Sequence, residues 1–548
     1  MSQMKDSVGC QYTGSEMQGQ IEPLAIGVGE IGSDPETGAQ WDITVTIPER
    51  IEKLVNRVYN WIKLQTLPNN EKKIAIVYYN YPPGKQNIGA SYLNVPESIF
   101  EILKRLKREG YNIGEIPSNA DALLDLMVKK GINIANWAPG ELEKLVNQSD
   151  IILWPVEDYL TWFNKLDRIA RKEMVEGPVG YIEELTKAAV EYIKKGDTRT
   201  RDEMLKTLNR WTQEMISNAN THPEVASTAI DLINKISAAL TSYIQDPSNT
   251  TAYETFLKYK GELLALKLPG MTGWGEPPGD VMVVEKNGEK YIIIPGLMFG
   301  NVFIGPEPQR GWEADAANLY HSTVVPPPHC YLAWYAWINT VFEANAQIHV
   351  GRHATYEWTP RKQYALASFD YPDICIGDTP SLYIYIMDGV GEGMQAKRRG
   401  LAVIIDHLTP PFTQTKLYGD LQELAGLIIN YEKTPEGNPM REEYAKQIRE
   451  TIIKTAIYKD MNIDPNNITD EDIDKIHDYL LDIKRTLMPY GLHTFSLNWT
   501  SDEIALMVST MLSPDSDVDP SLQKLVSTAM GWDFKNLTLI ILTKNQST

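Results

Sequence analysis

The chain has few cysteines and no long apolar run. Its 548 residues include only Cys10, Cys330 and Cys375, with no CxxC pair, which argues against a disulfide framework and against a thiolate zinc site. No apolar run reaches the roughly 18 residues needed to span a bilayer, and the N-terminal residues lack the charged-then-apolar pattern of a signal peptide. The sequence therefore predicts a cytoplasmic protein with no membrane span.

Positive charge is also scarce. The chain has 52 Lys and Arg residues against 72 Asp and Glu residues, which gives a formal net charge of −20. A nucleic-acid partner needs a basic face for its phosphates, so this composition argues against one. It leaves room for a local basic pocket that binds an acidic small molecule.

Histidine is rare but concentrated. Five of the eight histidines lie between residues 321 and 407, namely His321, His329, His349, His353 and His407. An even distribution would place about one or two histidines in a stretch of this length. Composition alone does not account for this clustering.

Changes in apolar spacing divide the chain into five expected regions. These are an N-terminal segment and helix (1–70), an α/β domain (71–165), a helical insertion (166–265), an α/β core with the His-rich site (266–415) and a mainly helical C-terminal region (416–548). The first helix is expected to begin near Pro48, because apolar residues then recur at helical spacing, at Ile51, Leu54, Val55, Val58, Trp61 and Ile62. Thr469 and Asp472 resemble a capping box that begins another helix.

Short apolar runs predict the strands, at residues 74–79, 132–137, 150–155, 291–294, 346–350, 382–386 and 401–405, with a further strand-like run at 537–542. Several of these runs alternate with helical patterns through glycine-containing loops. This order predicts an α/β fold of several domains with Rossmann-like α/β units.

The segment HVGRHATYEW carries two histidines and a glutamate spaced four residues apart, His349, His353 and Glu357. Gly351 and the β-branched neighbours favour a strand that ends near His349, followed by a loop. Two imidazoles and a carboxylate suit divalent zinc, cobalt or nickel, and they can also accept protons. Val350 excludes the HExxH metalloprotease motif. On this motif alone, two structural histidines are an equally good interpretation.

Aromatic residues follow three prolines and His329, at Tyr331, Trp334, Tyr335 and Trp337. Such rings could line a pocket for a large flat ligand. Their helical spacing favours a core helix for most of them.

The segment DGVGEGMQAKRRG has a basic cluster, Lys397, Arg398 and Arg399. The strict dinucleotide-binding spacing fails at Met394, and the looser form is weak evidence. Arginine forks bind carboxylates bidentately, although a solvated run of charge is the usual interpretation of such a triplet. Gly84 and Lys85 lack the rest of a phosphate-binding loop, so no convincing nucleotide motif is present.

Taken together, these segments resemble the large subunit of cobaltochelatase (CobN) and the H subunit of magnesium chelatase. The matching segments run in one order, from GQIEPL, IPERIEKL and YYNYPPGKQNIGASYLNVPES, through MFGNVFIGPEPQRGW, LYHSTVVPPPHCYLAWYAW and AQIHVGRHATYEWTPRKQ, to GDTPSLYIYIMDGVGEGMQAKRRGLAVIIDHLTPPF and GLHTF. They cover roughly residues 19–500.

The resemblance implies a protein that binds a corrin or porphyrin together with a divalent metal, while separate AAA+ ATPase subunits hydrolyse ATP. It implies an insertion site lined by His349, His353 and Glu357, with His321, His329 and His407 nearby. The expected substrate-binding residues are Tyr320, Arg310, Glu392, Gln395, Lys397, Arg398 and Arg399. Imidazole ligation favours cobalt, with nickel or magnesium as alternatives. A non-catalytic tetrapyrrole or metal carrier or sensor is the main alternative function, and a metal-dependent hydrolase is a weaker one.

Several residues depart from the pattern that the resemblance implies. The family usually has glycine where Ala354 and Arg361 stand, Asn-Pro where Gly389 and Val390 stand, and threonine where Met394 stands. Family large subunits are also commonly more than twice as long. We therefore expect a short or split member of the family: one piece of a split subunit, with other pieces as candidate partners, a truncated gene product, or a stand-alone paralogue.

Overall fold

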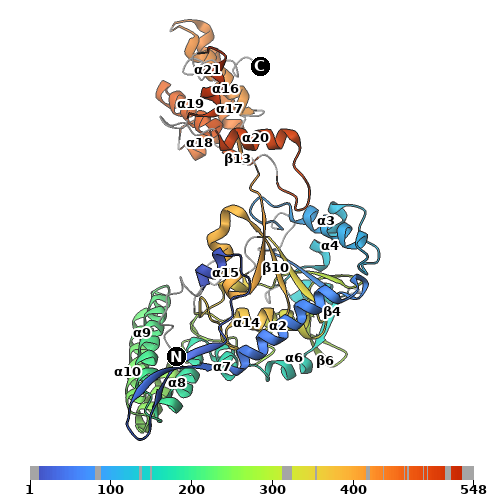
Figure 1. The fold of residues 1–548 in the computed structure, drawn as a ribbon. Helices are drawn as coiled ribbons and strands as arrows, with labels where there is room; N and C mark the ends of the chain where they lie inside the picture. Colours follow the sequence, from blue (N-terminus) through green and yellow to red (C-terminus); the bar gives the residue numbers. More distant parts are fainter. Residues whose placement is uncertain are drawn as a thin grey trace. The chain divides into compact units, whose positions relative to one another are not determined.

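The computed structural model describes residues 12–80, 88–134, 139–147, 151–268, 270–310, 324–351, 355–410, 412–414, 420–435, 437–461, 463–465, 468–485, 487–489, 492–512 and 520–532. The chain divides into two compact units (Figure 1). The first unit contains Met1–Leu408 with Thr494–Ser496, and the second contains Thr409–His493 with Leu497–Thr548.

A six-stranded sheet forms the centre of the first unit. Its order is β11 (Ala402–His407), β10 (Ser381–Ile386), β9 (Ala346–Val350), β3 (Ile74–Tyr78), β8 (Val302–Pro306) and β7 (Leu297–Phe299). The first five of these strands run parallel to one another, and β7 pairs with β8 in the antiparallel direction. If β3, β8, β9, β10 and β11 are numbered 1 to 5 along the chain, their order in the sheet, read from β8, is 2-1-3-4-5. This is the order of a flavodoxin-like doubly wound sheet. The predicted α/β fold class is confirmed. The strands predicted at 74–79, 346–350, 382–386 and 401–405 are present, and their ends differ from the predicted ends by at most two residues.

Helices cover both faces of this sheet, and β3 shows how its sequence fits them. Its residues Ile74 to Tyr78 are all buried. Ile74, Ile76 and Tyr78 pack in the layer that contains α3 (Val95–Arg108) and α4 (Ala120–Lys130). Ala75 and Val77 face the layer of α13 (His329–Thr340) and α14 (Tyr371–Ile376). An unbroken apolar run is typical of a parallel strand buried on both faces.

A small antiparallel sheet has the order β4 (Ile152–Pro155), β6 (Glu289–Ile294) and β5 (Val283–Lys286). The predicted strands at 150–155 and 291–294 therefore form, but they pair with each other rather than within the parallel sheet. The strand predicted over 132–137 is wrong for residues 132–134, which have no regular secondary structure, and 135–137 lie outside the described residues. Helices α5 (Pro139–Val146) and α6 (Val156–Phe163) flank β4 along the chain.

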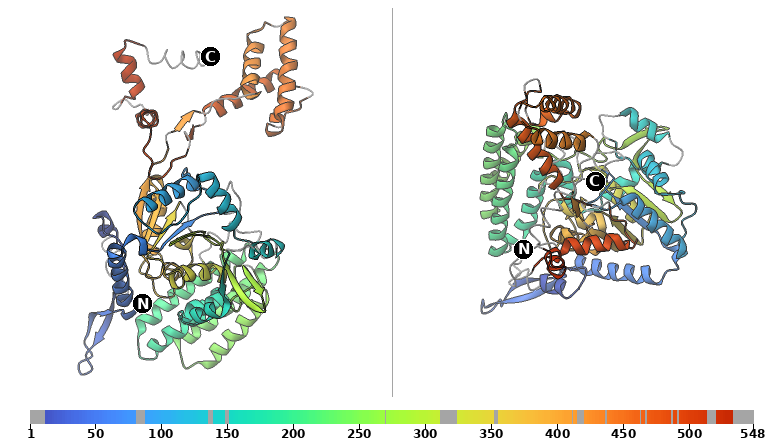
Figure 2. Two further views of the ribbon diagram at one scale, coloured as in Figure 1. Left: turned by 90° about the vertical axis from the view of Figure 1, so that its right-hand side faces the viewer. Right: turned by 90° about the horizontal axis from the view of Figure 1, so that it is seen from above.

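The long charged helical patterns form a bundle of five helices (Figure 2). These are α7 (Arg168–Glu176), α8 (Pro178–Ile193), α9 (Thr198–Ala219), α10 (Ala226–Gln245) and α11 (Thr250–Ala265). Their apolar faces share one core, in which Trp211 is 2% exposed and donates a hydrogen bond to the Pro178 carbonyl at 2.9 Å.

The N-terminal part of the first unit consists of α1 (Gly14–Met17), a hairpin of β1 (Gly27–Ser33) and β2 (Gln40–Thr46), and α2 (Pro48–Thr66). The helix predicted to begin near Pro48 is confirmed. Its buried residues are Arg50, Lys53 and Arg57, so its polar face and not its apolar face is turned inward.

The second unit contains α16 (Asp420–Lys433), α17 (Pro439–Thr455), α18 (Ile457–Asp460) and α19 (Asp470–Arg485), followed by α20 (Ser501–Met511) and α21 (Leu522–Ala529), with β12 (Phe412–Gln414) pairing β13 (Leu487–Pro489). The predicted capping box is confirmed: Asp472 N–H donates to Thr469 Oγ1 at 3.2 Å, and Thr469 N–H donates to Asp472 Oδ2 at 3.0 Å. The run at 537–542 lies outside the described residues. Within the described chain, no helix is both long and apolar enough to cross a membrane.

Candidate functional site

A small pocket lies at the carboxyl ends of β3 and β9. It is lined by Val77, Tyr78, Tyr79, Glu307, His349, Val350, Gly351 and Tyr383. The chain continues from β3 to β8 on one side and then returns to β9 on the other side, so these two strands form the topological switch point of the sheet. Ligands of doubly wound sheets bind at this point, outside the carboxyl ends of the strands.

Of the predicted site residues that the structure describes, His349 is the one that lines this pocket. It lies near the end of β9, is 1% exposed, and is the register partner of Val77 on β3 and of Tyr383 on β10. Neither of its ring nitrogens has a hydrogen-bond partner among the described residues. Burial lowers the pKa of His349 to about 3, so the ring is neutral at physiological pH. A neutral imidazole of this kind suits a divalent transition metal.

Glu357 lies on the short helix η4 (Tyr356–Trp358) and is linked to His349 through Tyr383, whose ring packs near the imidazole. Its Oε1 accepts a hydrogen bond from the Tyr383 hydroxyl at 3.1 Å, and its Oε2 has no partner among the described residues. Glu357 is fully buried; this burial, together with the charge of Glu307, raises the pKa of Glu357 well above its usual value. A raised pKa makes the carboxylate form of Glu357 a stronger proton acceptor.

Glu307 is a second buried carboxyl in the pocket, directly after β8. It accepts hydrogen bonds from the hydroxyls of Tyr331 and Tyr335, both at 2.6 Å. It also accepts from the Thr355 N–H at 2.5 Å, the Thr355 hydroxyl at 2.9 Å and the Tyr356 N–H at 3.3 Å. Burial raises the pKa of Glu307, against the effect of these donors. Glu307 was not predicted as a site residue, although an acidic residue directly after the apolar strand VFIG is a usable signal.

Three tyrosine rings surround His349. The ring centroid of His349 is 4.9 Å from that of Tyr356, 5.3 Å from that of Tyr383 and 6.4 Å from that of Tyr335. The hydroxyls of Tyr335 and Tyr383 each bind one of the two buried carboxyls. His349 therefore lies between two tyrosine–glutamate pairs.

The turn that carries Glu357 is held by two buried arginines. Arg399 donates to the carbonyls of Glu357 at 2.5 Å and Pro360 at 2.9 Å. Arg310 donates to the carbonyl of Trp358 and to that of Val325, both at 3.1 Å. Both were predicted to bind substrate; in the structure, these contacts position the turn.

The rest of the basic cluster lies on α15 (Val390–Arg399). Arg398 forms a bidentate pair with Glu16 of α1, at 2.8 and 2.7 Å. Lys397 and Gln395 are half-buried on the same helix, and Glu392 accepts a hydrogen bond from Tyr385 at 3.4 Å. Of the three predicted cations, Lys397 is thus the one that these intramolecular contacts do not engage.

The remaining histidines differ from His349. His329 Nδ1 is 2.8 Å from the Tyr159 hydroxyl, its Nε2 is 3.0 Å from the Gly275 carbonyl, and burial lowers its pKa to about 4. His407 ends β11, with its Nδ1 3.3 Å from the Leu408 carbonyl. Tyr320, His321 and His353 lie outside the described residues. Among the residues that are described, no group of three or more His, Cys, Asp or Glu side chains is arranged to hold a metal.

Arg361 shows how one departure from the expected pattern is accommodated. Its φ of 88° lies in the left-handed region that favours glycine. The guanidinium forms an ion pair with Glu173 of α7 and lies 3.7 Å from the ring centroid of Tyr181 on α8. The arginine therefore joins the loop after Glu357 to the helical bundle.

The sequence matches the family described as CobN/Magnesium Chelatase over residues 3–195 and 203–548. The chain belongs to the CobN/magnesium chelatase family. It is 31% identical over 503 residues to the uncharacterized protein MJ0908 of Methanocaldococcus jannaschii, and the match covers 90% of this chain and 32% of that protein. It is 27% identical over 450 residues to the aerobic cobaltochelatase subunit CobN of Sinorhizobium sp, covering 82% of this chain and 27% of the relative.

The fold agrees with this membership in the CobN/magnesium chelatase family. The structure resembles the catalytic subunit of cobaltochelatase from Mycobacterium tuberculosis with a TM-score of 0.56 at 22% identity, over 90% of this chain and 33% of that chain. The chain thus spans about a third of the length of the relatives it matches.

Proposed function

We propose that this chain is part of the large subunit of a tetrapyrrole metal chelatase and carries its metal-insertion site. Family membership supports the reaction class. The observation that carries the proposal is the buried, neutral His349 at the switch point of the sheet, whose ring nitrogens have no partner among the described residues. Tyr383 links it to the buried Glu357 carboxyl, because the Tyr383 ring packs near His349 and its hydroxyl donates to Glu357. Cobalt is the favoured metal, because imidazole suits it better than it suits magnesium.

Insertion requires the metal ion to lose its water ligands and two pyrrole nitrogens to lose their protons. In our proposal, His349 holds the divalent ion through a ring nitrogen, with His353 as a second ligand on the basis of its spacing. Glu357 is either a further ligand or the base that accepts a pyrrole proton. Its raised pKa supports the second role.

The substrate ring, a corrin or a porphyrin, carries acid side chains. Lys397 is the proposed cation for one of these carboxylates, because it is half-buried on α15 and not engaged by the contacts that occupy Arg398 and Arg399. Arg398 would first have to release Glu16. ATP is proposed to be hydrolysed by separate AAA+ subunits, and other pieces of a large subunit are proposed as further partners.

A non-catalytic carrier or sensor of tetrapyrrole or metal is the second candidate. The observation that favours it is the change in the loops around the proposed site, where Ala354, Val390 and Met394 stand in place of the residues that the family usually has. The two candidates differ in whether metallated ring appears.

The test is a titration of the chain with several corrins and porphyrins, followed by insertion assays with Co²⁺, Ni²⁺ and Mg²⁺. The assays contain ATP and the ATPase subunits of a cobaltochelatase. A chelatase gives ATP-dependent metallated product, fastest with Co²⁺. Tight ring binding without product supports a tetrapyrrole carrier, and absence of ring binding contradicts the chelatase.

A further inference from the structure

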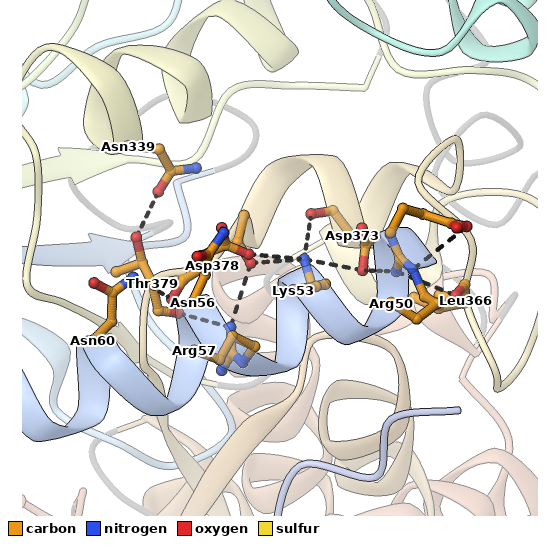
Figure 3. A network of polar contacts seen from close by, with 12 residues as sticks. Arg50, Lys53, Asn56, Arg57, Asn60, Asn339, Leu366, Asp373, Asp378 and Thr379 are labelled. Carbon is orange, nitrogen blue, oxygen red and sulfur yellow. Dashed lines mark hydrogen bonds and ion pairs between the residues drawn. The ribbon is translucent and has the colours of Figure 1, made fainter. Parts of the chain in front are cut away.

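Helix α2 is attached to the body of the first unit through charged side chains. Arg50, Lys53 and Arg57 are 3%, 6% and 1% exposed. They face the segment of α14 and the residues just after it, as Figure 3 shows. Buried charges are unfavourable unless they are paired, so this attachment depends on its partners.

Those partners are numerous. Arg50 and Lys53 form ion pairs with Asp373 at 2.9 and 3.0 Å. Arg57 pairs with Glu22 at 2.5 Å. It also donates to the Thr379 carbonyl at 3.1 Å (Figure 3). Along the same side of the helix, Asn56 and Asn60 donate to the carboxylate and the carbonyl of Asp378 at 3.0 and 2.9 Å. This network fixes which side of α2 faces outward.

The outward side is apolar. We call it the α2 face, and it consists of Val55, Val58, Tyr59 and Ile62, which are 59%, 50%, 64% and 52% exposed. Their spacing of three and four residues places them in one stripe, opposite the buried cations. A contiguous exposed apolar stripe of this kind marks an interaction surface.

The hairpin β1–β2, next to α2 along the chain, shows the same lack of cover. It is a separate two-stranded sheet that extends away from the body of the first unit in Figure 2. None of its residues with a described side chain is buried, and Trp41 is 49% exposed. An isolated hairpin is only marginally stable in water, so it needs a surface to pack on.

Exposed apolar side chains are not spread evenly along the described chain. Of the 26 large hydrophobic residues that are exposed, 8 lie between Met17 and Ile62 and 10 between Leu492 and Trp532. The long region between them contains the other 8. The N-terminal surface is therefore a local feature of the fold and not a general property of this protein.

We propose that the α2 face and the hairpin β1–β2 dock a part of a CobN-type large subunit that has no counterpart in these 548 residues. The proposal rests on the family membership and on the proposed role as part of a large subunit. The matched relatives contain about two thirds of their length outside the match, which provides the occupant. A second copy of this chain is disfavoured because each copy carries a net charge of −20.

The test is co-expression of the full 548-residue chain with tagged MJ0908 from which the matched region has been deleted. Complex mass is measured by light scattering and affinity by titration. The variant is Val58→Glu/Ile62→Glu, which changes only exposed side chains. The matched control is Tyr192→Glu/Leu257→Glu, at residues of α8 and α11 that are 57% and 42% exposed. Unchanged melting temperatures confirm that both variants fold.

We expect a one-to-one complex with the wild-type chain, a Kd raised about tenfold or more in the α2 variant, and no change in the control. The absence of a complex, or equal affinity of the α2 variant, overturns the proposal. A wild-type dimer that the α2 variant converts to a monomer also overturns it, in favour of a second copy. This binding needs no metal, ring or ATP, so its failure is distinct from failure of the proposed chelatase function.

Discussion

His349 and Tyr383 are register partners on the adjacent parallel strands β9 and β10, with ring centroids 5.3 Å apart. The Tyr383 hydroxyl donates to Glu357 at 3.1 Å. One tyrosine therefore contacts both the proposed metal ligand and the proposed proton acceptor. The pKa of Glu357 should therefore change when the Tyr383 hydroxyl is removed.

Tyr383→Phe should shift the acid limb of the pH–rate profile for insertion to higher pH. The hydroxyl lowers the pKa of Glu357 by donating to its charged form. Its loss raises that pKa further, so the carboxylate is lost at a higher pH. The measurement is kcat against pH for wild type and variant. An unmoved limb, or a shift to lower pH, would argue against Glu357 as the base.

Glu307→Gln should loosen the turn at residues 355–358. Thr355 N–H, Thr355 hydroxyl and two tyrosine hydroxyls all donate to this carboxylate, and an amide NH₂ cannot accept from them. We expect a loss of about 2–3 kcal/mol in local stability. Hydrogen exchange at the amides of Thr355 and Tyr356 measures it, with Glu285→Gln as the exposed control. Unchanged protection of both amides would show that Glu307 does not hold the turn.

Lys397→Gln and Arg399→Gln should separate substrate binding from support of the site. Arg399 is 3% exposed and holds two carbonyls, so its replacement lowers the melting temperature. Lys397 is half-buried, and its replacement should weaken the binding of a carboxylated tetrapyrrole by about tenfold while leaving melting unchanged. Equal ring affinity of wild type and Lys397→Gln would remove Lys397 from the substrate site.

His329 should make the first unit less stable as the pH falls. Its folded pKa is about 4, below the usual 6.5, because burial disfavours the charged ring. Between these two values the unfolded chain binds a proton that the folded chain does not, so stability present above pH 6.5 is lost on the way down to pH 4. From pH 7 to pH 5 we expect a loss of about 2 kcal/mol relative to His329→Gln. Denaturant unfolding of both proteins at the two pH values measures the difference, and parallel curves would contradict it.

The strands of the central sheet could be predicted because a parallel strand covered on both faces is a continuous apolar run, as at Ile74 to Tyr78. The orientation of α2 could not. Its cations are buried because they pair with Asp373 and Asp378. These partners lie more than 300 residues further along the chain, so no local pattern connects them to the helix. Helical spacing alone identifies the apolar face but not which face is turned inward.

Part of the candidate site could likewise be predicted from the sequence, and part could not. The spacing of His349 and Glu357 indicates a shared site; in the structure His349 lines the pocket, and Glu357 is linked to it through Tyr383. The role of Glu307 depends on donors at Tyr331, Tyr335 and Thr355, which no local pattern connects to it. The basic cluster likewise looks uniform in the sequence, whereas the fold gives Arg398 and Arg399 different partners.

The metal-insertion activity of the variant Glu357→Gln tests most directly the central claim, that Glu357 takes part in metal insertion. The variant keeps the shape of a side chain that is fully buried and bound by Tyr383, but it cannot accept a proton. In an ATP-dependent assay with Co²⁺ and the ATPase subunits, with Glu343→Gln as the exposed control, we predict no metallated product from Glu357→Gln and an unchanged Kd for the tetrapyrrole. Full insertion activity in Glu357→Gln would contradict the account.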